Sequence, residues 1–243
     1  MNYSTKIRWS FISSIIASIL WVMGDILIVG FHVDPAKYPL FTETYVDQLD
    51  HTLALLMIEG STERLMWGAL LASMSAFLFL PGVWLAYQFF KDKRKPHAWL
   101  TYFILVISVV LMPLGHADFY YSGELFKAIY HTDPSAHAYL IEMAAGFTKV
   151  LYIAWGTAIA VLLFGWLLFS ILVFCGKTVL PKWVGFISPV FITLYQQPIK
   201  LLLPDGLLKA WISAAGFNIA YLLFFILLAI YFNKREKSQH PLL

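Results

Sequence analysis

Four polar side chains occur at similar depths within long apolar stretches of the sequence. Asp25 and Asn218 each lie sixteen residues from the basic end of their stretch, which is roughly 24 Å along a helix. Gln196 and Gln197 reach a similar depth in a third stretch. An ionised carboxylate facing lipid at this depth would be costly. Asp25 is therefore expected to face other helices and to find a partner among these three amides.

A second group of polar residues lies further out, where several apolar stretches begin or end. Glu63 and Arg64 precede one stretch, and His116 and Asp118 follow another. Together with the deeper group they predict a polar cavity with an apolar floor that opens to the outer face. The predicted ligand-binding residues are Asp25, Glu63, Arg64, His116, Asp118, Gln196, Gln197 and Asn218.

No metal, cofactor or nucleotide is predicted. Histidines and carboxylates that could bind zinc are present, but no two histidines have the i, i+4 spacing of a helical site and no HExxH motif occurs. Neither a nucleophile elbow, nor a P-loop, nor a dinucleotide fingerprint is found. Cys175 is the only cysteine, so no internal disulfide is possible. The sequence assigns no catalytic residue.

The elements that must position these residues are transmembrane helices. Hydrophobic residues make up 60% of the chain and charged residues only 13%, whereas soluble domains are about 25% charged. Such a composition excludes a nucleic-acid-binding domain. A membrane-spanning helix needs about 20 apolar residues. We therefore predict a single all-α domain, a polytopic bundle of six transmembrane helices, at about 9–31, 65–90, 98–115, 150–175, 183–199 and 210–233.

The distribution of charge predicts the orientation of the bundle. With the N-terminus in the cytoplasm, eleven of the seventeen basic residues lie on the inner side and twelve of the fourteen acidic residues lie on the outer side or near it. Cytoplasmic loops are enriched in Lys and Arg. Both termini are therefore predicted to be cytoplasmic.

The two long segments predicted to lie outside also contain helical signals. Apolar residues between Tyr45 and Met57 recur at three- and four-residue spacing, which predicts an amphipathic helix along the membrane surface or over the mouth of the bundle. In the second segment, Asp133 and Pro134 are typical of a helix start. The fourth transmembrane helix is thus predicted to begin outside the bilayer and to expose His137 near its start.

Several motifs resemble those of an uncharacterised family of bacterial six-helix membrane proteins. They are Gly24-Asp25, the segment Ser61–Leu65 with Gly68, Pro81-Gly82 with Trp84 and Tyr87, Pro113 with His116, and Gly216-Phe217-Asn218. This resemblance implies a location in the bacterial inner membrane. It implies no activity, cofactor or catalytic residue.

Three functions remain open at this level. The first is an outward-facing pocket that binds a small amphiphile or a membrane lipid, for transport, sensing or storage. The second is an intramembrane enzyme on a lipid-soluble substrate, with His116 and either Asp118 or Glu63 as acid and base. The third is a structural or assembly subunit without a ligand.

Overall fold

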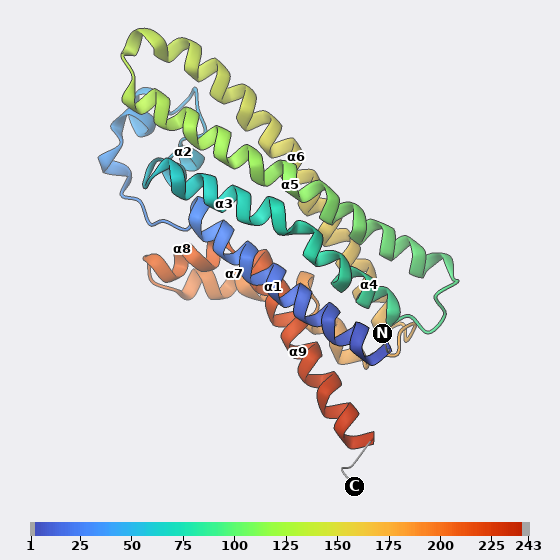
Figure 1. Ribbon diagram of the computed structural model, residues 1–243. Coiled ribbons are helices and arrows are strands. Elements are labelled where there is room, and N and C mark those ends of the chain that lie inside the picture. The colour runs from blue at the N-terminus through green and yellow to red at the C-terminus, as the bar shows by residue number, and fades with distance from the viewer. Residues whose placement is uncertain (1–2, 240–243) are drawn as a thin grey trace.

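The computed structural model describes the backbone of residues 3–239 and the side chains of residues 5–234. Within these ranges the chain is helical and forms no strand (Figure 1). The α-helices are α1 (Tyr3–Val29), α2 (His51–Ile58), α3 (Thr62–Ser75), α4 (Leu80–Gln88), α5 (Pro96–His131), α6 (Pro134–Phe174), α7 (Pro189–Leu202), α8 (Leu207–Ala214) and α9 (Gly216–Gln239). Short 3₁₀ or π turns occur at Pro35–Lys37, Leu40–Thr44, Ala76–Phe79 and Lys182–Ile187.

Five helical segments in the described chain are long and apolar enough to cross a membrane. They are Thr5–Val29, Thr62–Gln88, Pro96–His131, Pro134–Phe174 and Gly216–Lys234. The second comprises α3 and α4, joined by the 3₁₀ turn at Ala76–Phe79. The all-helical prediction and these five segments are confirmed, and they indicate a multi-pass membrane protein.

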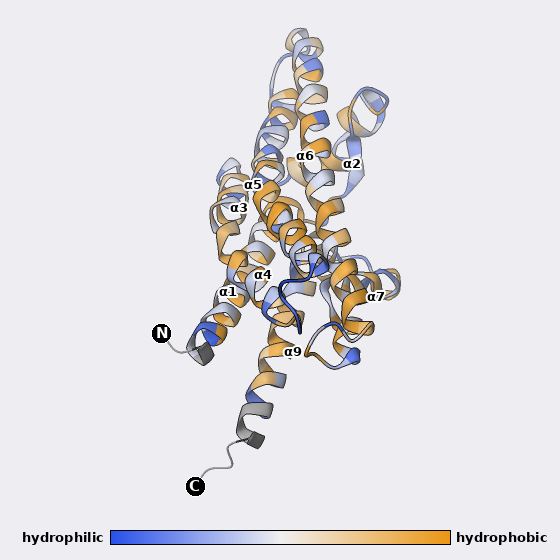
Figure 2. Cartoon of the chain, turned by 90° about the vertical axis from the view of Figure 1, so that its right-hand side faces the viewer, coloured by the Kyte–Doolittle hydropathy of each residue, from blue (hydrophilic) through white to orange (hydrophobic). Residues whose placement is uncertain are grey.

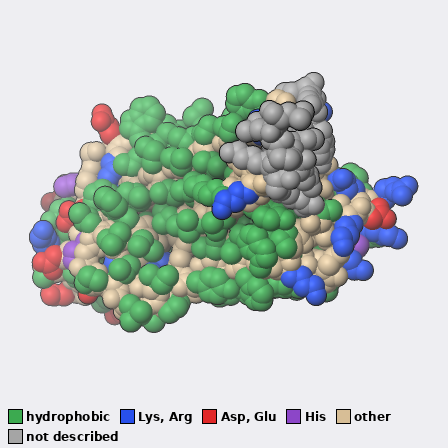
Figure 3. Space-filling view, turned by 90° about the horizontal axis from the view of Figure 1, so that it is seen from below, with side chains coloured by type: hydrophobic (Ala, Val, Ile, Leu, Met, Phe, Trp, Pro, Cys, Tyr) green, Lys and Arg blue, Asp and Glu red, His purple; other side chains and the backbone are tan. Residues whose placement is uncertain are grey.

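The outer surface of the bundle exposes many large apolar side chains, which is unusual for the surface of a soluble protein. In α1, large apolar side chains recur every three or four residues on the exposed face: Trp9, Ile12, Ile16, Ile19 and Met23. Figure 3 shows hydrophobic side chains covering the middle of one face, with most charged side chains at its two ends. Figure 2 shows that the long helices are hydrophobic along much of their length, whereas the loop between α4 and α5 is hydrophilic. Large exposed apolar surfaces mark contact with lipid or another protein.

The predicted sixth span at 183–199 differs from the structure. This stretch is divided between a 3₁₀ turn at Lys182–Ile187 and α7, which is only 14 residues long. Pro189 begins α7, because a proline lacks the N–H group that a continuous helix would need there. A helix of this length extends about 21 Å, which is less than the bilayer core of ~30 Å. Within the described residues the structure thus gives five helices of spanning length instead of six, with α7 and α8 as a short hairpin before α9.

The basic ends of several helices lie together. Phe232 of α9 packs against Phe11 of α1 and against Phe89, with ring centroids 5.9 and 5.2 Å apart. Phe90 forms an isolated antiparallel bridge with Thr178, just beyond α6. The start of α1, the end of α4, the end of α6 and the end of α9 are therefore at the same end of the bundle (Figure 1).

At the opposite end, α5 and α6 project as a hairpin. With 36 and 41 residues they extend about 54 and 62 Å, much further than a bilayer core. Asp133 caps α6 by accepting a hydrogen bond from the backbone N–H of Ser135, which confirms the predicted helix start. His137 was predicted to be exposed, but it is buried. Its Nδ1 lies 2.8 Å from the Tyr45 hydroxyl and its Nε2 lies 3.1 Å from the Thr132 carbonyl, so both ring nitrogens have partners.

The predicted amphipathic helix is only partly present. Helix α2 begins at His51, after Asp50, whose side chain accepts a hydrogen bond from the backbone N–H of Leu53. Residues 45–50 are not helical. Leu53 and Met57 are buried in a cluster with Phe126 and Ile141 of the α5–α6 hairpin. The apolar side of α2 therefore packs on the protein, and its position on the membrane surface is not confirmed.

Candidate functional site

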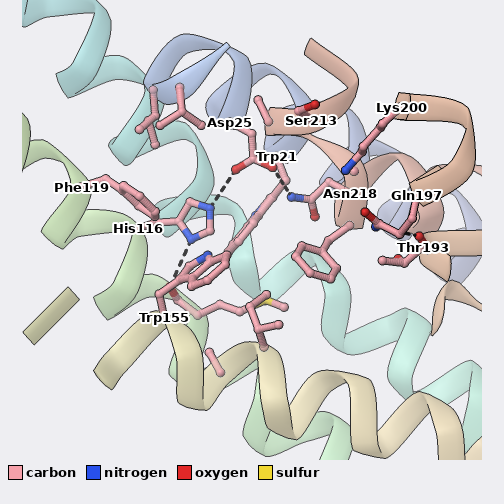
Figure 4. A pocket seen from close by; sticks show the side chains of 18 residues that line it. Trp21, Asp25, His116, Phe119, Trp155, Thr193, Gln197, Lys200, Ser213 and Asn218 are labelled. Atoms are coloured by element: carbon pink, nitrogen blue, oxygen red, sulfur yellow. Dashed lines mark hydrogen bonds and ion pairs between the residues drawn. The ribbon is translucent and has the colours of Figure 1, made fainter. Parts of the chain in front are cut away.

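Asp25, His116 and Asn218 form a hydrogen-bonded network between three helices. The Asn218 amide of α9 donates to Asp25 Oδ2 at 2.7 Å, and His116 Nε2 of α5 lies 3.1 Å from Asp25 Oδ1 (Figure 4). The side chains of His116 and Asn218 are almost completely buried, and that of Asp25 is 14% exposed. Both carboxylate oxygens therefore have a partner. Of the three amides predicted as possible partners of Asp25, Asn218 is confirmed as one.

The other nitrogen of His116 faces a backbone acceptor. Nδ1 lies 3.4 Å from the carbonyl oxygen of Met112, one turn earlier in α5. The carboxylate of Asp25 and this carbonyl are both hydrogen-bond acceptors. The ring also packs edge-on against Trp21, one turn before Asp25 in α1, with centroids 4.2 Å apart.

Close helix approaches at two glycines hold this network in place. A Cβ on Gly24, next to Asp25, would lie 2.9 Å from the backbone oxygen of Gly68 in α3. A Cβ on Gly115, next to His116, would lie 2.8 Å from the Cα of Trp155 in α6. Because backbones can approach so closely only where a side chain is missing, these glycines fix α1 against α3 and α5 against α6. The positions of Asp25 and His116 follow from these contacts.

The network forms one wall of a partly enclosed cavity of about 210 Å³. Helices α1, α5, α6, α7, α8 and α9 all contribute to it (Figure 4). Its polar side chains are Asp25, His116, Thr193, Gln197, Lys200, Ser213 and Asn218, and its aromatic ones are Trp21, Phe119, Trp155 and Phe217. The cavity thus combines one polar side with a largely aromatic wall.

Lys200 and Gln197 approach the cavity from α7, across from His116 (Figure 4). Gln197 Nε2 donates to the Thr193 carbonyl at 3.1 Å, one turn earlier. Among the side chains of residues 5–234, no hydrogen bond or ion pair of Lys200 is found. Burial lowers the pKa of the Lys200 ammonium below the ordinary value for lysine. An anion in the cavity would stabilise this charge.

Gln196 is buried beside the cavity at Gly216. It is only 7% exposed, and both its amide oxygen and its amide nitrogen lack a hydrogen-bond partner in the described structure. A Cβ on Gly216 would lie 2.8 Å from Gln196 Oε1 and 3.2 Å from Lys200 Nζ. The missing side chain at Gly216 therefore lets the Gln196 amide oxygen and the Lys200 ammonium both approach the start of α9 closely.

Arg64 was predicted to bind ligand, but it does not line the cavity. Its guanidinium donates to the carbonyls of Leu27 and Ile28 in the last turn of α1, and to those of Met57 and Glu59 at the end of α2. Helix ends leave such carbonyls without partners inside the helix. The structure therefore gives Arg64 a role in joining two helix ends.

Glu63 and Asp118 also lie outside the cavity lining. Glu63 is exposed at the start of α3, and Asp118 is buried in α5 with Oδ2 unpaired among the described groups. Asp118 follows His116 by two residues, and such side chains point in different directions on a helix. The acid that the structure brings to His116 is Asp25, not Asp118 or Glu63.

A shallower hollow of about 520 Å³ lies next to the cavity, and Ser213 lines both. It lies between α8 and the segment that follows α1, and it contains His32, His51, Asp205 and Lys209. Lys209 Nζ lies 2.8 Å from Asp205 Oδ1, and this hydrogen bond lowers the pKa of the Asp205 carboxyl. The charges of the hollow are thus paired, unlike that of Lys200.

Fold and site together describe a multi-pass helical membrane protein whose long helices enclose a buried acid–histidine–amide network beside a cavity. Residues 1–235 match a family described as a family of unknown function (DUF6796), and the chain belongs to that family. This confirms the expectation of an uncharacterised family. No curated protein and no solved structure matches the chain.

Proposed function

We propose that the cavity binds a small amphiphile or membrane lipid, in the service of transport, sensing or storage. The observation that carries this proposal is the network of Asp25, His116 and Asn218, which forms the polar wall of a cavity otherwise lined largely by aromatic and aliphatic side chains. Ligand sites are commonly apolar hollows with a few placed polar groups.

The dimensions of the cavity favour part of an amphiphile over a large polar substrate. Its volume of about 210 Å³ is below the ~300–1,000 Å³ that is usual for drug-sized ligands. A headgroup and the first part of a chain match this space, and the rest of the chain must leave it. The adjoining α7–α8 hairpin carries strongly exposed leucines, namely Leu201, Leu202, Leu207 and Leu208. A ligand chain leaving the cavity along this hairpin would meet apolar surface.

An enzymatic role for the same cavity remains the alternative. The separation of 3.1 Å between His116 and Asp25 is within the range of an acid–base pair, and both residues face the cavity. If the protein is an enzyme, His116→Gln should abolish turnover while bound amphiphile is retained. If the protein only binds, the same variant should change affinity alone. A structural subunit without ligand is the third possibility.

Native mass spectrometry of the gently purified protein tests the proposal. The expected result is a population of the chain that carries one bound molecule of lipid-like mass, released by collisional activation. A homogeneous unliganded protein that also takes up no added amphiphile would contradict the proposal.

We further propose that both termini face the cytoplasm and that the protein resides in the bacterial inner membrane. This orientation rests on the basic residues of the α4–α5 loop and of the segment after α6, which lie at the same end of the bundle as the start of α1. Helix α7 would then start near the inner end, where its Phe191 packs against Phe174 at the end of α6, and would carry the chain outward to α8 and the start of α9, with the cavity opening outward.

Cysteine labelling in intact spheroplasts tests the orientation. In a Cys175→Ser background, Asp47→Cys should react with a membrane-impermeant maleimide from outside, because Asp47 is exposed in the segment between α1 and α2. Arg94→Cys should react only after lysis, since Arg94 lies in the basic α4–α5 loop and its side chain is 95% exposed. The reverse pattern would invert the topology.

A further inference from the structure

The cavity has two polar regions, and they differ in whether their groups already have partners. In the first region, Asp25 receives hydrogen bonds from both His116 and Asn218, so both of its carboxylate oxygens already have partners within the protein. In the second, Lys200 has no partner among the described side chains, and Gln196, which lies beside the cavity and does not line it, is buried with both amide atoms unpaired. Buried polar groups without partners are uncommon in folded proteins. The second region is therefore the one in which a ligand could supply missing hydrogen-bond partners.

The unpaired groups converge on one point. Gln196 Oε1 and Lys200 Nζ lie 2.8 and 3.2 Å from the position that a Cβ on Gly216 would occupy. Gly216 lines the cavity and is the first residue of α9, a helix of 24 residues. The first N–H groups of a helix lack partners inside the helix, and the helix dipole favours negative charge there. An ammonium, an amide and a helix N-terminus thus surround the same small space.

The chemistry of this space selects an anion. Lysine offers three donors, and backbone N–H groups at a helix N-terminus bind carboxylates and phosphates readily. The Gln196 atom that faces this space is its oxygen, so its amide must turn to present its two N–H donors to an anion. A cation would meet the ammonium of Lys200 here, and in the other region it would find Asp25 already occupied by two partners.

We infer that the ligand is an amphiphile with a single anionic headgroup, a carboxylate or a phosphate, and that this headgroup binds between Lys200, Gln196 and the first turn of α9. The inference rests on the proposed function and specifies its ligand. The network around Asp25 then shapes the neighbouring wall of the cavity. The apolar chain extends along the aromatic side chains, among them Trp155 and Phe217.

Binding of a matched set of probes to the full-length protein in an uncharged detergent tests this assignment. The probes are dodecanoate, dodecyl phosphate, dodecanol and dodecyltrimethylammonium, with acetate and inorganic phosphate as headgroups without a chain. Dodecanoate or dodecyl phosphate should bind most tightly. Lys200→Gln should weaken their binding by about ten- to hundredfold, as expected for loss of a charge-assisted hydrogen bond, and leave dodecanol unchanged.

Gly216→Ala gives a second, independent variant. Its new methyl group would fill the space between Gln196 and Lys200, so anionic probes should bind more weakly although no charge has been removed. Gly146→Ala is the matched control, because a Cβ at that position meets nothing within 4 Å. The control should bind all probes as the wild type does.

Each other outcome rejects a defined part of the account. If dodecanol binds as well as dodecanoate, and Lys200→Gln changes neither, the headgroup assignment is wrong but the cavity still binds amphiphiles. Preference for dodecyltrimethylammonium would move the headgroup to Asp25 and overturn the inference. If acetate or inorganic phosphate binds as tightly as the long-chain probes, the anion site stands and the amphiphile of the proposed function is rejected. Failure of every probe to bind folded protein would overturn both.

Discussion

Replacing Asp25 by leucine is expected to reduce the free energy of unfolding by about 2–4 kcal/mol, because two buried donors lose their acceptor. These donors are His116 Nε2 and the Asn218 amide. In a thermal denaturation experiment in detergent, the melting temperature should fall by roughly 5–15 °C. Amphiphile binding should also be lost, since the wall that these three residues form would no longer be held together.

Asp25→Asn separates the shape of this residue from its charge. Asparagine has the same outline and retains one acceptor oxygen, so most of the stability should remain. Binding of an anionic amphiphile should persist or become tighter, because a negative charge has been removed from the same cavity. Met23→Leu is a suitable control, as Met23 is 48% exposed on the outer face of α1. An Asp25→Leu variant with native stability would show that the network does not join the helices.

Arg64→Met is expected to have the largest effect on stability of any single substitution considered. The guanidinium satisfies carbonyls at the ends of both α1 and α2, and it stacks 3.9 Å from the ring of Phe31. Leaving these carbonyls unpaired should cost on the order of 4 kcal/mol. The melting temperature measured in detergent should fall accordingly. Arg64→Lys should recover less than half of the loss, because one ammonium cannot span acceptors that a planar guanidinium reaches.

The control for Arg64 is Arg94→Met, whose side chain is 95% exposed and whose loss should leave stability unchanged. Binding provides the second readout. The Arg64→Met protein that remains folded should still bind one amphiphile with native affinity, because Arg64 does not line the cavity. Native stability together with lost binding would instead return Arg64 to the ligand site.

The depth of a residue along its helix could be predicted from the sequence, and this explains which part of the site was found. Asp25 was expected to find a partner among Gln196, Gln197 and Asn218 because their depths agree, and its hydrogen bond with Asn218 is present at 2.7 Å. A distance along a helix contains no information on the direction in which a side chain points. Arg64, Glu63 and Asp118 were predicted to lie at similar depths above Asp25, yet none of them lines the cavity.

The remaining differences depend on where helices end. The sequence could not show that Arg64 binds the carbonyls at the ends of α1 and α2, because the tertiary fold determines which helix ends lie beside Arg64. The stretch 183–199 has the composition of a span, but it is interrupted at Ser188 and Pro189, and α7 continues to Leu202. This shift brings Lys200 into the cavity, although its sequence position suggested an outer loop. The sequence contained one signal that Lys200 belongs to the site: it is a single lysine among apolar residues.

The most direct test of the central claim fills the cavity without changing its polar groups. Ile159 lines the cavity from α6, whereas Ile153 on the same helix is 61% exposed. Native mass spectrometry should find the bound amphiphile on the wild type and on Ile153→Trp, and should find it greatly reduced on Ile159→Trp, with all three proteins folded. Equal amounts of bound amphiphile on Ile159→Trp and Ile153→Trp would show that the ligand does not occupy this cavity and would contradict the account.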